Sequence, residues 1–232
     1  MDLQTLHAVN LARKARRAVI VLSDIDGGGE EVILEGNAVD GSLGEIVASA
    51  FRSGKPRMVD VAGREFFLNV YLPPPRIVVI GAVHISQALA RIAPVAGYDL
   101  TIIDPRTAFA TPERFRGVEL IADWPQDVFR QKPLDSYTAL AALTHDPKID
   151  DFPLCDALSR GCFYVGALGS RKTHARRFER LQRQGVRDDE LFRIAAPIGL
   201  DIAASNPAEI AVAILAEIIQ ALRHRDGVGE KR

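Results

Sequence analysis

Residues 77–104 read IVVIGAVHISQALARIAPVAGYDLTIID, and this stretch decides the fold. Its two apolar runs, 77–80 and 100–103, have the unbroken hydrophobicity of parallel strands that are buried on both faces. Between them, residues 85–96 carry apolar side chains at helical spacing. The rhythm continues with strands expected at 118–121, 138–143 and 163–165 and helices expected at 125–130, 152–159 and 171–184. This alternation predicts an α/β fold with a doubly wound, mostly parallel Rossmann-like sheet.

The last part of the chain carries a helix start. Asn206 is a capping residue, Pro207 suits the first helical position, and Glu209 stands at the third. We therefore expect an amphipathic helix that runs to about His224, followed by a frayed tail at 226–232.

Three consecutive prolines, residues 73–75, precede the first buried strand. Proline fixes φ and removes a backbone donor, so neither a helix nor a central strand is expected to cross this segment. Ahead of it we expect a first helix from Leu3, and a second from Ser42 to Arg52 that Ser42 and Glu45 open with a capping box. Strands are expected at 18–23, 31–34, 57–61 and 65–71. The expected domains are a small α+β domain at 1–72, a proline connector at 73–76 and a Rossmann-like domain at 77–225.

The charges are balanced, because 29 Lys and Arg stand against 30 Asp and Glu and the formal net charge is −1. This balance argues against a protein that coats nucleic acid or anionic membrane by bulk charge. No apolar run of about 18 residues predicts a membrane span, and the N-terminal sequence lacks the pattern of a secretory signal. Cys155 and Cys162 match neither a disulfide framework nor a zinc pattern, so we expect a cytoplasmic location, no metal site, and two buried thiols without chemistry.

The turn at residues 81–86 stands where a dinucleotide fingerprint belongs, directly after a strand and opening a helix. Only Gly81 of the G-x-G-x-x-G pattern is present, since Val83 replaces the glycine that admits a pyrophosphate and Ser86 replaces the one that serves helix packing. Asp104 ends the second strand, where it suits a ribose hydroxyl, although an Asp before Pro105 also forms turns. The turn favours the fold and disfavours NAD(P) as a ligand.

A second glycine loop, at residues 166–174, also leads from a strand into a helix. Ser170 is expected to cap that helix, whose free backbone N–H groups suit an anion. Arg171 and Lys172 fall in the first turn, where the helix dipole disfavours a cation by about 0.3–1 kcal/mol. Either a phosphate-like group neutralises them, or both are solvated surface residues. Part of the basic segment that follows is expected to be a solvated face opposite Ala175, Phe178 and Leu181.

Two further loops are expected at the same sheet edge. His145, after an apolar strand, is suited to act as an acid, a base or a ligand, or else is a hydrogen-bonded loop residue. Asp146, before Pro147, is interpreted as a turn residue. Asp201, ahead of the last helix, suits either the amino or amide edge of a heterocycle or the backbone N–H groups of its own loop.

These motifs form a recognisable set. From about residue 72 to residue 222 the chain closely resembles the C-terminal Rossmann-like domain of the XdhC/CoxI family, the accessory proteins of molybdenum hydroxylases. The resemblance rests on PPPR at 73–76, GAVHI at 81–85, DPR at 104–106, THDPK at 144–148, YVGALGSRKTH at 164–174, APIGLDI at 196–202 and NPAEIA at 206–211.

The resemblance implies a role in maturing xanthine dehydrogenase, carbon monoxide dehydrogenase or a similar enzyme. Family members look like chaperones that hold molybdenum cofactor, allow its sulfuration and deliver it, so the implied partners are an apo molybdenum hydroxylase and a cysteine desulfurase. A homodimer through the N-terminal unit is a further expectation. Two features depart from the family: Val83 stands at the second glycine of the turn, and the N-terminal unit lacks the Ser-Gly-Gly-Cys segment of longer members.

The leading hypothesis is therefore binding and delivery of molybdenum cofactor. Molybdopterin carries a phosphate, which suits the helix start after Ser170, and a pterin edge, which suits Asp201 or Asp104. The alternatives are an NAD(P)-dependent oxidoreductase on the same sheet and a purely structural partner of a dehydrogenase complex. The candidate cofactor-binding residues are Gly81, His84, Asp104, Arg106, His145, Gly166, Gly169, Ser170, Arg171, Lys172, His174 and Asp201.

Overall fold

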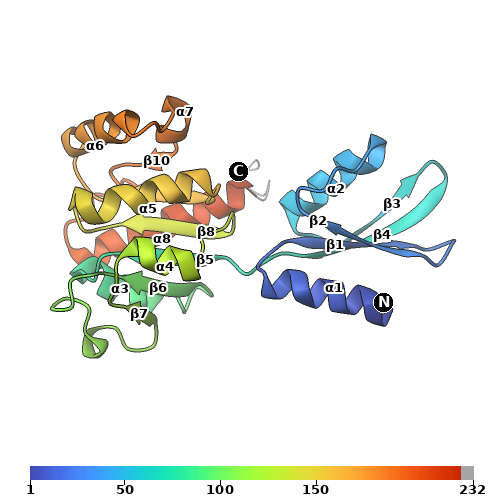
Figure 1. Ribbon diagram of the computed structural model, residues 1–232, viewed down its shortest axis with the longest axis horizontal. Helices are drawn as coiled ribbons and strands as arrows, with labels where there is room; N and C mark the ends of the chain where they lie inside the picture. The colour runs from blue at the N-terminus through green and yellow to red at the C-terminus, as the bar shows by residue number, and fades with distance from the viewer. Residues whose placement is uncertain (226–232) are drawn as a thin grey trace. The chain divides into compact units, whose positions relative to one another are not determined.

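The computed structural model describes residues 1–225 and divides them into two compact units (Figure 1). The first comprises residues 1–74 and, of the described C-terminal residues, 223–225; the second comprises residues 75–222. The tail predicted at 226–232 lies outside the described residues. No helix within residues 1–225 has the length and apolar character needed to cross a membrane.

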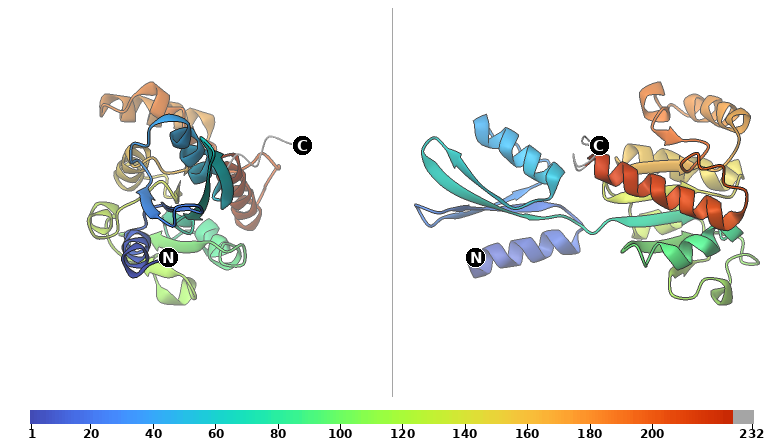
Figure 2. Two further views of the ribbon diagram at one scale, coloured as in Figure 1. Left: turned by 90° about the vertical axis from the view of Figure 1, so that its right-hand side faces the viewer. Right: turned by 180° about the vertical axis from the view of Figure 1, so that it is seen from behind.

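The first unit is a four-stranded antiparallel sheet with one helix on each face (Figure 2). In sheet order its strands are β2 (Glu30–Leu34), β1 (Val19–Asp24), β4 (Arg64–Tyr71) and β3 (Arg57–Val61). The first helix, α1 (Leu3–Lys14), packs Val9 and Ala12 against Val19 and Val21 of β1. Because side chains alternate along a strand, the intervening Ile20 faces the other layer, where α2 (Gly41–Ser53) lies.

The capping box predicted at the start of α2 is wrong. The helix begins at Gly41, one residue ahead of Ser42, and its N-cap is Asp40, whose side chain makes no capping hydrogen bond. Ser42 therefore lies within the first turn, where its hydroxyl is no longer placed to accept the N–H groups that a cap satisfies.

The second unit is a six-stranded, fully parallel sheet in the order β10-β9-β8-β5-β6-β7, which confirms the predicted Rossmann-type α/β fold. Numbered from the first strand of the unit, this is the doubly wound order 3-2-1-4-5-6 read from the other edge. The strands are β5 (Arg76–Ile80), β6 (Asp99–Ile103), β7 (Glu119–Ile121), β8 (Thr138–Ala142), β9 (Tyr164–Ala167) and β10 (Ile194–Ala195).

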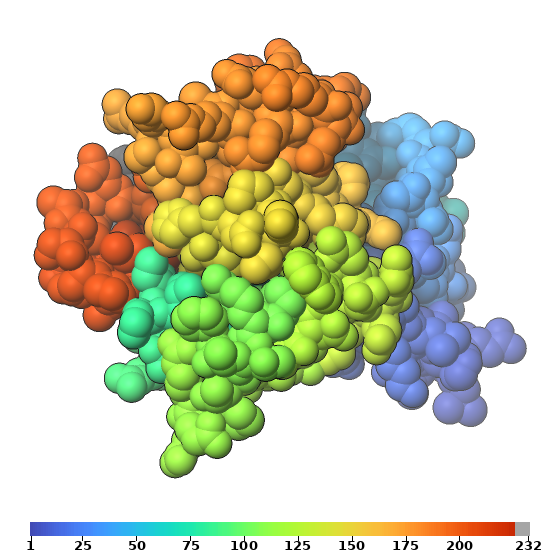
Figure 3. All heavy atoms as spheres, turned by 60° about the vertical axis from the view of Figure 1, so that its left-hand side comes forward, coloured from blue at the N-terminus to red at the C-terminus, as the bar shows by residue number. Residues whose placement is uncertain are grey.

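Helices cover both faces of this sheet, as the side chains that alternate along β5 show. Ile77 and Val79 point to the layer formed by α3 (His84–Ile92) and α8 (Pro207–Arg225), whereas Val78 and Ile80 point to the opposite layer. That layer contains α4 (Pro125–Gln131), α5 (Pro147–Ser159), α6 (Arg171–Arg183) and the short α7 (Asp188–Leu191). Figure 3 shows α6 lying beside α5 on the surface.

Several helix boundaries differ from the prediction for local reasons. α3 ends at Ile92 rather than at residue 96, because Pro94, which follows the C-cap Ala93, has no N–H to continue the helical hydrogen bonds. α5 begins at Pro147 rather than at residue 152, since Asp146 is its N-cap and accepts the Lys148 N–H at 3.0 Å. The start predicted for the last helix is confirmed, with the Asn206 carboxamide accepting the N–H groups of the second and third helical residues.

Candidate functional site

The sheet order creates a crevice between two neighbouring strands. The chain leaves β5 for α3 on one face, and it leaves β8 for α5 on the other face. The loops at the carboxyl ends of β5 and β8 therefore diverge, which in doubly wound folds is where ligands bind. The loops after β6 and β9 flank this crevice, so most of the predicted site residues share one edge of the sheet.

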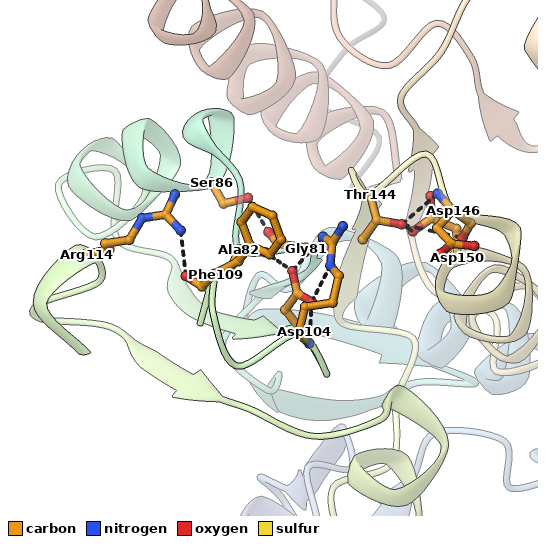
Figure 4. A network of polar contacts seen from close by, with 10 residues as sticks. Gly81, Ala82, Ser86, Asp104, Phe109, Arg114, Thr144, Asp146 and Asp150 are labelled. Carbon is orange, nitrogen blue, oxygen red and sulfur yellow. Dashed lines mark hydrogen bonds and ion pairs between the residues drawn. The ribbon is translucent and has the colours of Figure 1, made fainter. Parts of the chain in front are cut away.

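The turn after β5 is held closed by its neighbours. Gly81 has φ +115°, and a Cβ at this position would lie 2.9 Å from Thr144 Cγ2, so only glycine lets the two loops meet. The next residue, Ala82, donates its N–H to Asp104 Oδ2 at 2.7 Å. Ser86, fully buried in the first turn of α3, donates its hydroxyl to the Gly81 carbonyl (Figure 4).

Asp104 is fully buried and both of its oxygens are occupied. Besides the Ala82 N–H, they accept the Arg106 N–H at 2.9 Å, Nε at 2.9 Å and Nη2 at 2.8 Å. Burial alone would raise the pKa of this carboxyl, but the hydrogen bonds and charge of Arg106 and the Ala82 N–H hold it below its ordinary value. The two Asp104 oxygens therefore have no free position to accept a ribose hydroxyl. The guanidinium of Arg106 stacks on Phe109, with 4.7 Å between its Cζ and the ring centroid.

The loop after β8 contains a second buried carboxyl with different surroundings. Asp150, in the first turn and a half of α5, accepts the Thr144 hydroxyl at Oδ1 (2.7 Å), while its Oδ2 is buried without a partner. Burial raises its pKa to about 6. Thr144 also accepts the Asp146 N–H at 3.0 Å (Figure 4), and between them His145 is exposed with φ +63°. Lost hydration and the charge of Arg177 lower the pKa of His145.

The loop after β9 leads into α6 as predicted. Ser170 is the N-cap, and its hydroxyl oxygen accepts the Thr173 N–H at 3.3 Å. Arg171 and Lys172 follow in the first turn, exposed and without an ion pair among the described residues. The start of α6 thus combines free backbone donors with two uncompensated cations.

Arg177 is the residue of this site that the sequence analysis missed. It was counted with the solvated basic face, yet it is only 2% exposed, while Ala175, expected on the buried side, is exposed. Its Nη2 donates to the Leu168 carbonyl at 2.9 Å, which places the guanidinium against the loop before α6. Leu181, one turn on, is fully buried, and that i, i+4 spacing was the available signal.

The remaining predicted residues have various surroundings. His84 is exposed at the first position of α3, and Asp201 is exposed in the loop ahead of α8. His174 is half-buried in α6, where burial and the Arg177 charge lower its pKa. Gly166 is required by local packing, because a Cβ there would lie 2.5 Å from the Tyr164 hydroxyl and 2.6 Å from Ile198 Cγ1.

Neither cysteine is prepared for chemistry. Burial raises the pKa of Cys155, and raises that of Cys162 to about 12, so both thiols stay protonated near neutral pH. Within residues 1–225, no three His, Cys, Asp or Glu side chains are arranged to hold a metal ion.

The parallel sheet and its strand order define a Rossmann-type protein, and one helix start at the carboxyl edge of the sheet is cationic. Residues 77–218 match the family described as the XdhC Rossmann domain. The chain belongs to this family, the XdhC/CoxI family, as its motifs indicate.

Similar proteins carry names consistent with this family. The chain is 32% identical over 155 residues to a probable xanthine dehydrogenase subunit of Bacillus subtilis, covering 66% of this chain and 45% of that one. It is 29% identical over 156 residues to the molybdenum cofactor insertion chaperone PaoD of Escherichia coli, covering 67% and 43%. A crystal structure described as a xanthine dehydrogenase from Bacillus halodurans superposes with a TM-score of 0.62 at 25% identity, covering 97% of this chain and 66% of that one. The chain thus spans less than half the length of the curated relatives.

Proposed function

We propose that this protein is an accessory factor in the maturation of a molybdenum hydroxylase of the xanthine dehydrogenase or carbon monoxide dehydrogenase type. In this role it binds molybdenum cofactor and supports its sulfuration and insertion. Membership of the XdhC family and the name of the Escherichia coli chaperone support the proposal. The partners it requires are the apo-hydroxylase and a cysteine desulfurase as the sulfur source, and self-association through the first unit belongs to the same proposal.

The observation that carries the proposal is the start of α6. Arg171 and Lys172 stand at the positive end of a helix dipole, and no carboxylate within residues 1–225 forms an ion pair with either of them. A phosphate monoester, which molybdopterin carries, reverses that unfavourable arrangement, because cations and free N–H groups then share one anion. The residues of this chain that fit the phosphate are therefore Ser170, Arg171 and Lys172.

The pterin part requires a carboxylate or a carbonyl to bind its amino edge. Asp104 does not fit this role, since its oxygens accept hydrogen bonds from Ala82 and Arg106. The exposed Asp201 does fit, as it stands in a loop that Glu217 holds by accepting the Gly199 N–H at 2.7 Å. We assign Asp201 the recognition of the pterin edge and assign Asp104 a structural role.

The test is retention of free molybdenum cofactor by the purified protein through gel filtration. Wild type is expected to retain it, and Arg171→Ala/Lys172→Ala is expected to lose it. A matched control is Arg13→Ala/Lys14→Ala, which removes another exposed Arg-Lys pair, in α1 of the first unit. No retention by wild type rejects the function, and equal retention by wild type and the α6 variant rejects the site.

The alternative, an NAD(P)-dependent oxidoreductase, is favoured by the strand order. It is opposed by Val83 and by the engagement of Asp104, which together remove the pyrophosphate and ribose contacts of the fingerprint. Titration with NAD(H) and NADP(H) separates the two, because binding at micromolar concentration would support the alternative and binding at millimolar concentration or none would end it.

A further inference from the structure

Most of the buried polar atoms without partners in the described chain lie in α5 and α6, two helices that pack on each other. Seven buried side-chain N or O atoms within residues 1–225 lack a hydrogen-bond partner, and four of them lie in Asp150, His174 and Arg177. They are Asp150 Oδ2, His174 Nδ1 and the Nε and Nη1 atoms of Arg177. A buried donor without an acceptor destabilises a protein, so such a concentration in a few side chains calls for a ligand or a function.

A complete ion pair joins α5 and α6 close to Arg177 and gives a comparison for it. One turn further along α6, Arg180 donates Nε and Nη2 to the two oxygens of Asp151 in α5, at 2.9 and 3.0 Å. Arg177 and Asp150 come from the same two helices, yet no carboxylate of the described chain forms a hydrogen bond or an ion pair with Arg177. They are close enough for each to affect the other's pKa.

The position of Arg177 connects it to the start of α6. Its Nη2 donates to the carbonyl of Leu168, two residues before the N-cap Ser170. The guanidinium therefore lies against the loop that leads into the helix start with the exposed cations. His174 belongs to the first turn of the same helix, and its neutral imidazole is able to donate from Nδ1.

We propose that Arg177, His174 and Asp150 form the inner half of a phosphate-binding site whose outer half is Ser170, Arg171 and Lys172. Arg177 and His174 donate to two phosphate oxygens, and a third oxygen, which carries the hydrogen of a singly protonated phosphate group, donates it to Asp150 Oδ2. This inference rests on the proposed function for the larger ligand, and it names the group of that ligand which the chain recognises.

The shared proton determines which anion the site prefers. At pH 7.5 inorganic phosphate still carries one hydrogen to share with Asp150, while sulfate carries none and faces the repulsion of a carboxylate. We therefore expect phosphate to bind at least about tenfold more tightly than sulfate, from the single hydrogen bond gained and the repulsion avoided.

The experiment measures binding of inorganic phosphate and of sulfate by titration calorimetry at pH 7.5. Arg177→Gln is expected to weaken phosphate binding by about tenfold or more. The matched control is Arg183→Gln, an exposed residue of the same helix, which removes the same charge and is expected to leave binding unchanged. Asp150→Asn replaces the acceptor by an amide and is expected to abolish the preference for phosphate over sulfate.

Arg177 is buried, so circular dichroism checks the fold of its variant, and Asp150→Asn tests the site independently should Arg177→Gln unfold. No phosphate binding by wild type, or equal preference in wild type and Asp150→Asn, overturns the inference. Retention of molybdenum cofactor through gel filtration shows whether the inner phosphate site or the proposed function has failed. Selective phosphate binding without retention of molybdenum cofactor rejects only the function; retention by wild type and folded Arg177→Gln alike rejects only the inner site.

Discussion

Two glycine-containing turns lead from a strand into a helix at the same edge of the parallel sheet, and they differ in the charged side chains beside them. At the turn after β5, Asp104 from the end of β6 accepts hydrogen bonds from Ala82 and Arg106. After β9, Arg171 and Lys172 stand in the first turn of a Ser170-capped helix, and that turn contains no acidic residue. A strand–glycine–helix pattern therefore defines the fold at both places, while the fate of the neighbouring charges decides which turn is able to hold an anion.

The two buried carboxyls of the unit repeat this contrast. Asp104 has a lowered pKa, because Arg106 and Ala82 outweigh its burial. Asp150 has a raised pKa, because its burial outweighs the Thr144 hydroxyl, the charge of Arg177 and the backbone N–H groups of Thr144 and His145. The first carboxyl has all its hydrogen-bond partners, and the second, in α5, has one oxygen without a partner.

Asp104→Asn should destabilise the protein by about 3 kcal/mol, since it removes the charge that Arg106 pairs with and leaves buried donors poorly matched. Urea unfolding monitored by circular dichroism measures the change. The control is Asp201→Asn in an exposed loop, expected to change the free energy of unfolding by less than about 0.5 kcal/mol. Equal effects of the two substitutions would contradict the closed character of the first turn.

The parallel strands and the cap at Ser170 could both be predicted from the sequence. Strand and helix periodicity around residues 77–104 was sufficient for the parallel sheet, because β5 and β6 are buried on both faces and read as continuous apolar runs. The cap at Ser170 was equally local, since the side chain bonds a backbone N–H three residues away. Such features depend on neighbours in sequence.

What the sequence could not reveal depends on neighbours in space. Asp146 was interpreted as a turn residue, and only the position of α5 shows it to be a helix cap. The sequence places Arg177 among surface cations. Its burial depends on how α6 packs on α5, which the sequence does not show. The two-residue strand β10 and the short α7 carry too little periodicity to be recognised.

The raised pKa of Asp150 predicts a specific dependence of stability on pH. Between about pH 4 and pH 6 the folded state keeps a proton that the unfolded state has released, so the stabilisation from this proton falls as pH rises through that window. Relative to Asp150→Asn, wild type should lose up to about 3 kcal/mol of unfolding free energy from pH 4 to pH 7, the equivalent of about two pKa units. Unfolding titrations at several pH values measure the difference.

The control for this titration is Thr144→Val. The Thr144 hydroxyl lowers the pKa of Asp150 by its 2.7 Å hydrogen bond, so removing it should move the window to higher pH. A difference in unfolding free energy between wild type and Asp150→Asn that stays constant from pH 4 to pH 7 would show that Asp150 titrates like an exposed carboxyl.

Ser170→Ala should cost about 1 kcal/mol, the usual value of an N-cap hydroxyl, and much less than Asp104→Asn. The smaller loss follows because the N–H groups at an open helix start remain accessible to water. Ser170→Asp distinguishes capping from simple loss of contact, since a carboxylate caps as well and also neutralises the adjacent cations. Thermal unfolding should therefore show Ser170→Asp at least as stable as wild type, with weakened phosphate binding.

The smallest expected effect has the opposite sign. Arg171→Ala/Lys172→Ala should raise the stability of the ligand-free protein by roughly 0.5 kcal/mol, because it removes two cations from the positive end of α6. The gain should shrink in high salt, which screens exposed charges, and should reverse in saturating phosphate, which stabilises only the form that binds it. A variant less stable than wild type without phosphate would mean that Arg171 and Lys172 serve the fold, and the contrast between the open and the closed turn would then lose its electrostatic basis.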